Sequence, residues 1–140
     1  MKIKLLSGAL LLWLATGIAG CKKDNPNTLI VKLSGKWQVL KIETKTFNAS
    51  GAVVTDNTVN YGVSDYLDFK NNESSDLEVS LAGTRQVGNY VVFLGTAFNL
   101  SLPSKLLACN AEVINDNTLQ FTGTIDGSSP RTTETWFLKR

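Results

Sequence analysis

The sequence predicts an all-β domain: a single antiparallel up-and-down β-barrel of about eight strands, with a sandwich of two sheets as the alternative. From Leu33 onward, apolar and polar residues alternate with a period of two, which is typical of strands with one buried and one solvated face. Clusters of Asn, Asp, Gly, Ser and Pro separate these runs. No later segment has the apolar spacing of a long helix. The spacing of the runs is that expected for an antiparallel barrel or sandwich.

Residues 1–20 are predicted to be an export signal and not part of the fold. Lys2 and Lys4 form a positive head, and residues 5–19 are almost wholly apolar and uncharged. As a helix this run would span about 22 Å at 1.5 Å per residue, whereas a helix that crosses a membrane must cover roughly 30 Å. A positive head, a short apolar middle and small residues at the end are typical of a signal peptide.

The end of this segment resembles the lipobox of bacterial lipoproteins. Ile18, Ala19, Gly20 and Cys21 match its apolar residue, two small residues and cysteine. The resemblance implies cleavage after Gly20, a diacylglyceryl group on the Cys21 sulfur and an acylated new amino terminus, with chains such as palmitate. Two or more fatty chains give a stable anchor, whereas one gives only marginal membrane binding. Cys21 is therefore expected to be a membrane tether; the alternative is an ordinary signal followed by a plain thiol.

Residues 21–32 are expected to form the acylated amino terminus and a flexible leash, and residues 33–140 the barrel domain. The opening "CKKD" resembles that of many Bacteroidota lipoproteins, in some of which a lysine and acidic residues after the cysteine direct export to the cell surface. In this leash only Asp24 is acidic. The expected location is the outer membrane of the cell envelope, on its periplasmic face or at the cell surface.

The alternating runs provide the candidates for the interior of the barrel. "DYLDFK", "DLEVSLA", "AFNLSLP" and "NTLQFTG" each place large apolar residues two apart. "GNYVVFLG" is apolar on both faces, which predicts a strand that is covered on both sides or lies at an interface. The residues expected to line the interior, as ligand contacts or as packed core, are Leu67, Phe69, Leu77, Val79, Tyr90, Phe98, Leu100, Phe121 and Trp136. Their size favours a filled interior, because eight strands enclose only a small ligand or their own side chains.

The two ends of the domain resemble the opening and closing motifs of lipocalin-type barrels. "LSGKWQVLKIE" contains Gly35 and Trp37 at the start of the first strand, and "TETWFLKR" ends in Arg140. The resemblance implies that Arg140 lies over the Trp37 ring and seals one end of the barrel. Residues 48–63, rich in Gly, Asn and Thr, are expected to form a long connection that lids the other end, because loops of this length are uncommon unless they act as lids or binding loops.

The composition provides little for catalysis. The sequence contains no histidine, which removes the usual general base and the commonest zinc ligand. Without residues 1–20, and so without Lys2 and Lys4, the chain carries twelve basic and twelve acidic residues, and no excess of basic residues indicates nucleic-acid binding. Cys109 is expected to be a buried, unreactive thiol. We therefore expect no enzyme activity, no metal and no cofactor.

Two functions of different classes follow from these observations. The first is an envelope lipoprotein that binds a small apolar or amphipathic ligand near the open end of a lipocalin-like barrel. The second is a filled barrel that docks on another cell-envelope protein, through a surface such as "YVVFLG".

Overall fold

The computed structural model describes residues 26–140. The predicted signal peptide, the lipidation site Cys21 and the first part of the predicted leash lie outside the described residues. Among residues 26–140, no helix is long and apolar enough to cross a membrane.

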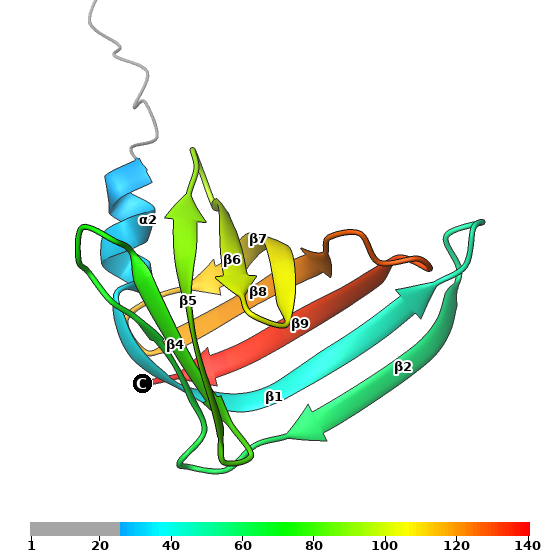
Figure 1. Ribbon diagram of the computed structural model, residues 1–140, viewed down its shortest axis with the longest axis horizontal. Coiled ribbons are helices and arrows are strands. Elements are labelled where there is room, and N and C mark those ends of the chain that lie inside the picture. The colour runs from blue at the N-terminus through cyan, green and yellow to red at the C-terminus, as the bar shows by residue number, and fades with distance from the viewer. Residues whose placement is uncertain (1–25) are drawn as a thin grey trace, which may run out of the picture.

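The described chain forms one short helix and a single antiparallel sheet of nine strands (Figure 1). The elements are α2 (Pro26–Leu33), β1 (Gly35–Phe47), β2 (Val53–Asn60), β3 (Tyr66–Phe69), β4 (Asp76–Leu81), β5 (Thr84–Val92), β6 (Ala97–Leu102), β7 (Lys105–Ile114), β8 (Thr118–Ile125) and β9 (Thr132–Lys139). From β3 to β9, each strand pairs with the next one along the chain. This is the predicted up-and-down order.

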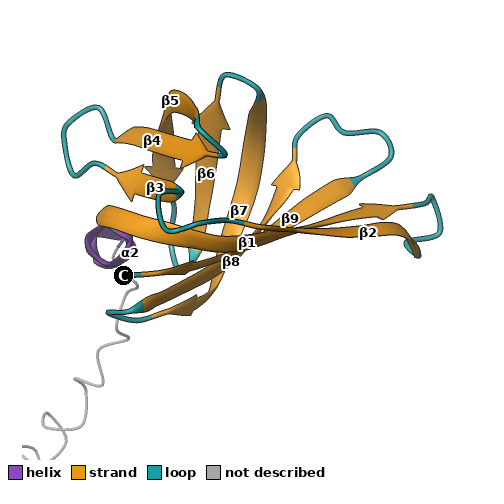
Figure 2. Cartoon of the chain, turned by 90° about the horizontal axis from the view of Figure 1, so that it is seen from below, coloured by secondary structure: helices purple, strands orange, loops and turns teal. Residues whose placement is uncertain are grey.

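β1 closes the sheet into a barrel, because both of its edges are paired. On one edge its first residues pair with β3, from Gly35 opposite Phe69 to Gln38 opposite Tyr66. On the other edge it pairs with β9 along most of its length. β1 and β3 to β9 thus form a closed ring of eight strands (Figure 2). The predicted antiparallel barrel is confirmed, and the two-sheet sandwich is excluded.

The ninth strand, β2, shows that the prediction of one long loop over residues 48–63 was wrong. β2 pairs with the second half of β1, and residues 48–52 and 61–65 are only the turns at its ends. The hairpin of β1 and β2 extends away from the barrel (Figures 1 and 2). All eight residues of β2 are exposed, so the strand lacks the one-sided burial that makes a strand recognisable from sequence.

Helix α2 shortens the predicted leash. Residues 26–32 were expected to be flexible, but they belong to the helix Pro26–Leu33, whose Leu29 and Leu33 are buried in the same core as the barrel. The indole nitrogen of Trp37 donates a hydrogen bond of 2.7 Å to the carbonyl oxygen of Leu33. Eight residues are too few to form a stable helix alone, so this helix depends on packing against the barrel, which local sequence patterns do not reveal.

A chain of aromatic rings runs through the interior of the barrel. The ring of Phe69 lies 5.2 Å from that of Tyr90 and 6.2 Å from that of Phe98, centroid to centroid. Phe98 continues to Phe121 at 5.2 Å, and Phe121 stacks on Trp136 at 5.6 Å. Ring separations of this size are those of aromatic pairs in direct contact. These contacts fill the middle of the barrel with its own side chains.

Candidate functional site

All nine residues predicted to line the interior do face it, and all nine are buried. They are Leu67, Phe69, Leu77, Val79, Tyr90, Phe98, Leu100, Phe121 and Trp136. They form one continuous cluster with the other buried apolar residues. Their side chains therefore pack against one another as one core.

One end of the barrel is sealed by the residues predicted to close it. The guanidinium carbon of Arg140 lies 3.9 Å from the centroid of the Trp37 ring, and the guanidinium also donates a hydrogen bond to the carbonyl oxygen of Ser34. Gly35, with a φ of +105°, lies beneath it, and a Cβ atom at this position would approach the Arg140 Nη2 to 3.4 Å. Glycine is thus favoured here by its backbone conformation, because a Cβ atom would make only an ordinary contact with Arg140.

The opposite end, which we call the mouth, has side chains that are less buried than those of the core. Four apolar side chains at strand ends and turns pack on the core but remain partly exposed: Tyr61, Leu81, Leu102 and Ile125. Together with an ion pair described next, they form the inner rim of the barrel. The mouth therefore combines partly exposed apolar side chains with one ion pair.

The ion pair of the mouth joins Lys105, the first residue of β7, to Glu134 in β9. The Lys105 Nζ lies 2.5 Å and 2.7 Å from the two carboxylate oxygens of Glu134. The side chains are only 23% and 9% exposed, respectively. Both residues lie on the inward phase of their strands, Lys105 two residues before buried Leu107 and Glu134 two residues before buried Trp136.

This ion pair contacts the aromatic core directly. The Trp136 indole nitrogen donates a hydrogen bond of 3.0 Å to Glu134, and the Lys105 Nζ lies 5.6 Å from the centroid of the Trp136 ring. Gly123 of β8 pairs with Glu134 on one side and with Cys109 on the other, and a Cβ atom there would come within 2.9 Å of the Cys109 sulfur. The strands beside the ion pair are thus closely packed around Gly123.

A second carboxylate organises the rim. Asp65 is buried and accepts hydrogen bonds of 2.7 Å from the backbone N–H of Gly62 and of Ala82. These bonds join the turn before β3 to the turn between β4 and β5. Burial, followed by the negative charges of Glu134 and Asp65, raises the pKa of the Tyr61 phenol. The phenol of Tyr61 therefore stays neutral at the rim, where it can donate a hydrogen bond.

The donors of the mouth are only partly used by contacts within the described residues. Two of the three N–H donors of Lys105 are occupied by Glu134, and among contacts within residues 26–140 the third has no partner. Cys109 lies deeper in the barrel, and its burial raises the pKa of the thiol far above its usual range. Within residues 26–140, no three His, Cys, Asp or Glu side chains come together as a metal site.

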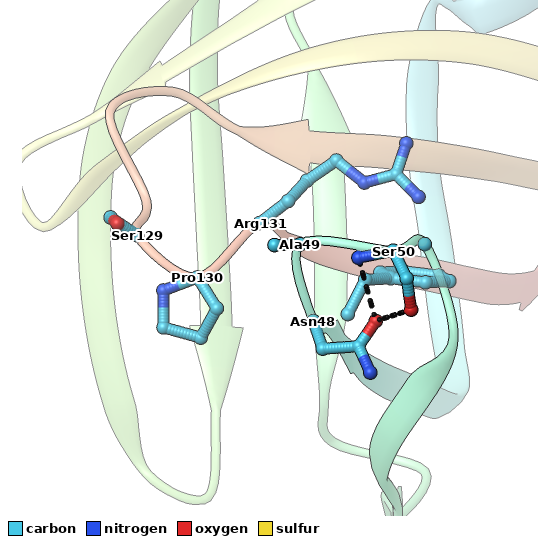
Figure 3. Close-up of a pocket in the computed structure, with 8 residues that line it drawn as sticks. Asn48, Ala49, Ser50, Ser129, Pro130 and Arg131 are labelled. Carbon is cyan, nitrogen blue, oxygen red and sulfur yellow. Dashed lines mark hydrogen bonds between the residues drawn. The ribbon is translucent and has the colours of Figure 1, made fainter.

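A depression lies at the far end of the β1–β2 hairpin (Figure 3). Its volume is about 760 Å³, and it is open to solvent between residues 47–51 and the turn 129–131. The Arg131 guanidinium carbon lies 4.2 Å from the centroid of the Phe47 ring. The Asn48 side-chain oxygen accepts hydrogen bonds from the Ser50 hydroxyl and from the backbone N–H of Ser50 and of Ala52. This oxygen is thus used to hold the turn, not to bind a ligand.

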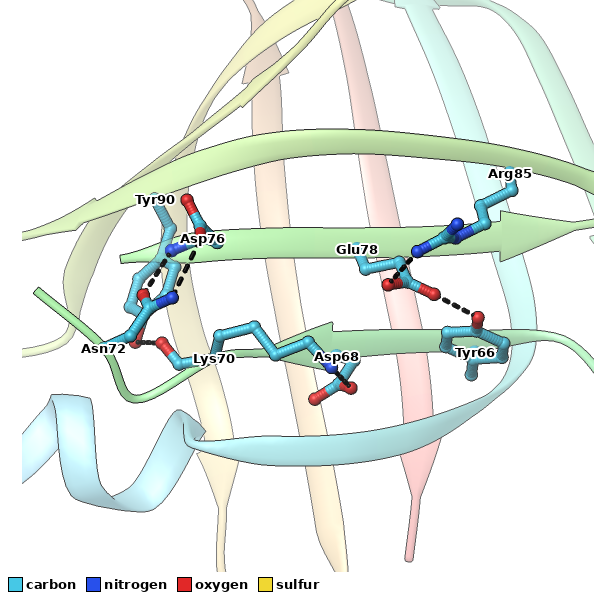
Figure 4. Close-up of polar contacts among 8 residues, drawn as sticks. All are labelled: Tyr66, Asp68, Lys70, Asn72, Asp76, Glu78, Arg85 and Tyr90. Carbon is cyan, nitrogen blue, oxygen red and sulfur yellow. Dashed lines mark hydrogen bonds and ion pairs between the residues drawn. The ribbon is translucent and has the colours of Figure 1, made fainter. Parts of the chain in front are cut away.

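A polar network covers the outside of β3 to β5 (Figure 4). Arg85 donates a hydrogen bond of 2.7 Å to Glu78, and the Tyr66 hydroxyl donates to the same carboxylate. These two bonds, that of Arg85 first, lower the pKa of Glu78 to about 2. Lys70, the residue after β3, forms an ion pair with Asp68 in β3. The network residues alternate with the buried residues of β3 and β4, so they lie on the outer face of the wall.

The mouth residues Lys105 and Glu134 were not among the candidates from the sequence. A signal for them exists, because each is a charged residue at the position where its strand otherwise places a buried apolar residue. A charge in the apolar phase of a strand indicates a partner, since an unpaired buried charge is strongly unfavourable. The sequence alone does not identify the partner.

Comparisons with known proteins add no relative to this description. No family model matches the chain, and no curated protein or solved structure matches it either. The function must therefore be argued from the site itself.

Proposed function

We propose that this protein is a non-enzymatic lipoprotein, anchored in the outer membrane through Cys21, that binds a small amphipathic ligand at the mouth of its barrel. The observation that carries the proposal is the Lys105–Glu134 ion pair, largely buried inside the mouth and in contact with Trp136. Burying two charges is costly, and well-packed apolar residues at the same place often stabilise a protein more. A buried ion pair at this position therefore indicates a role beyond stability. Binding a ligand is such a role.

The chemistry of the mouth defines the ligand. The remaining N–H donor of Lys105 would bind an acceptor oxygen, such as a carboxylate, carbonyl or hydroxyl group. The apolar part of the ligand would lie against Tyr61, Leu81, Leu102 and Ile125. Because the aromatic chain fills the interior below, the ligand would sit in the mouth and not enter the barrel deeply.

Ligand binding can be tested on the acylated chain purified from its own membrane. Native mass spectrometry in mild detergent is expected to show a discrete added mass that is lost on denaturation. Titration with the released compound should change the fluorescence of Trp136, which contacts the ion pair. A protein that carries no added mass and whose fluorescence is unchanged by envelope lipid and metabolite extracts would contradict the proposal.

A double variant tests the role of the ion pair without leaving one charge unpaired. Lys105→Met with Glu134→Gln keeps an acceptor for the Trp136 N–H but removes the ammonium donor. Loss of a hydrogen bond to a charged group, about 1.5–3 kcal/mol, should weaken binding at least about tenfold. The matched control is Lys45→Met with Asp56→Asn, an exposed ion pair of 3.6 Å on the β1–β2 hairpin, which should leave affinity unchanged.

A second candidate function is docking on another envelope protein, and one observation favours it. β2 pairs only with β1 among the described strands, so the other edge of this exposed strand is free for a partner strand. Addition of a strand at a free edge is a common mode of peptide recognition. Crosslinking from position 57 in β2 to one envelope protein in cells, with no ligand in the mouth, would favour this function over the first.

A further inference from the structure

The turn between β5 and β6 presents two large apolar side chains to solvent. Phe93 is 47% and Leu94 63% exposed, and Val91 on the outer face of β5 is exposed as well. This is the segment "YVVFLG", which the sequence predicted to be covered on both sides or to lie at an interface; in the described chain only its inward side is covered. No charged residue occurs from position 86 to position 104. An exposed apolar patch of this kind is typical of an interaction site.

The turn holds these side chains in place. The backbone N–H of Phe93 donates a hydrogen bond of 2.9 Å to the carbonyl oxygen of Ala97, and Gly95 adopts a φ of +75° between them. The Thr96 hydroxyl donates a hydrogen bond of 2.7 Å to the side-chain oxygen of Asn110 on β7. Phe93 and Leu94 therefore project from a turn whose backbone is hydrogen-bonded.

The turn lies at the end of the barrel next to α2. β5 ends and β6 begins at the sealed end, where β1 also begins, and α2 contacts β5. In Figure 1 the first turn of α2 and the tip between β5 and β6 both project toward the top of the view. The turns that surround the mouth lie at the other ends of the same strands.

The length of the chain before α2 limits how far this end can be from the anchor. Only four residues separate Cys21 from Pro26, the first residue of the helix. Even fully extended, five residue steps reach at most about 18 Å at 3.6 Å each. A Cys21 held at a membrane surface therefore keeps the start of α2, and with it the sealed end, close to that surface.

We propose that Phe93 and Leu94 insert into the interfacial layer of the membrane that holds Cys21, so that the sealed end faces the bilayer and the mouth faces away from it. The inference rests on the acylation of Cys21 in the proposed function. The segment has no charge that would lose its hydration on insertion, and apolar side chains are stabilised at the boundary between headgroups and acyl chains. The short tether, the ordered apolar turn and the absence of charged residues from position 86 to position 104 all favour a lipid surface.

Quenching of tryptophan by brominated lipids tests this orientation. The acylated Phe93→Trp protein is reconstituted into vesicles of phosphatidylethanolamine and phosphatidylglycerol whose acyl chains carry bromine near the headgroup. The matched control is Val53→Trp, at a position of similar exposure, 50%, in the hairpin beyond the mouth. The unaltered protein provides the background, because Trp37 and Trp136 are fully buried in the barrel. The expected result is a blue shift and a loss of intensity for Phe93→Trp, with neither for Val53→Trp.

Intact mass and flotation of the same samples separate the two proposals. An acylated, vesicle-bound Phe93→Trp protein whose added fluorescence is not quenched would overturn the insertion and leave the anchor intact. Equal quenching at both positions would overturn the orientation. A blue shift at position 93 without vesicles, together with a doubled mass, would replace the membrane by a second copy of the chain. A protein that lacks acyl groups and does not float would overturn the anchor and the insertion together.

Discussion

The two ends of the barrel are built from the same strands but differ in chemistry. At the sealed end, Arg140 covers Trp37 and α2 packs buried leucines against the core. At the mouth, the Lys105–Glu134 ion pair is held inside the ring, and the apolar side chains around it stay partly exposed. Under the proposed function this difference is a division of roles, in which the sealed end provides stability and the mouth binds the ligand.

The largest expected effect comes from breaking the sealed end. Trp37→Ala should lower the free energy of unfolding by about 3–5 kcal/mol, as for other large aromatic residues truncated in a core. Urea denaturation followed by circular dichroism measures it. Val63→Ala, at a side chain that is 91% exposed, is the control and should have almost no effect. A small effect of Trp37→Ala would contradict the view that the sealed end contributes most to the stability of the barrel.

Breaking the ion pair at the mouth should destabilise the protein less. Lys105→Met leaves Glu134 without its cation, and the expected loss is about 2–3 kcal/mol, below the 3–5 kcal/mol of a fully buried pair because Lys105 remains partly exposed. Adding Glu134→Gln to the same chain should restore most of the stability. If the double variant is as unstable as the single one, the ion pair is needed for stability, and the mouth is not the less stabilising end.

A milder change at the sealed end tests whether the two ends are independent of each other. Arg140→Lys removes the planar stacking of the guanidinium on Trp37 but keeps the charge. The expected loss of unfolding free energy is about 0.5–1 kcal/mol, the size of an exposed cation–π contact. Ligand affinity at the mouth, measured by titration, should not change. A loss of affinity in this variant would show that the two ends are coupled.

The smallest expected effect on stability comes from the polar network on the outer wall. The pKa of Glu78 is lowered to about 2 by its hydrogen bonds with Arg85 and Tyr66, from an ordinary value of 4.5. The carboxylate therefore contributes stability above pH 4.5, and this contribution is lost as the pH falls from 4.5 through 2. Urea midpoints measured across this range should fall less for Glu78→Gln than for the unaltered protein. Identical pH dependence in the two proteins would show that the network does not persist in solution.

The parts of the fold that could be predicted are those with a local pattern. Phe98 and Leu100, or Leu119 and Phe121, lie two residues apart, and this spacing indicates a strand with one buried face wherever it occurs. β2 and α2 were missed for the opposite reason. β2 is a strand with no buried face, and α2 is a helix too short to be stable without the barrel.

The fold class and the inward residues of most strands follow from the sequence alone, and the lipobox-like start predicts an anchor. The tertiary structure was needed to show that Lys105 meets Glu134 and that Phe93 and Leu94 project at the same end as α2. The cause is the separation of these residues along the chain. A period of two is set by neighbouring residues, whereas Lys105 and Glu134 lie 29 residues apart and meet only because β7, β8 and β9 pair in one register.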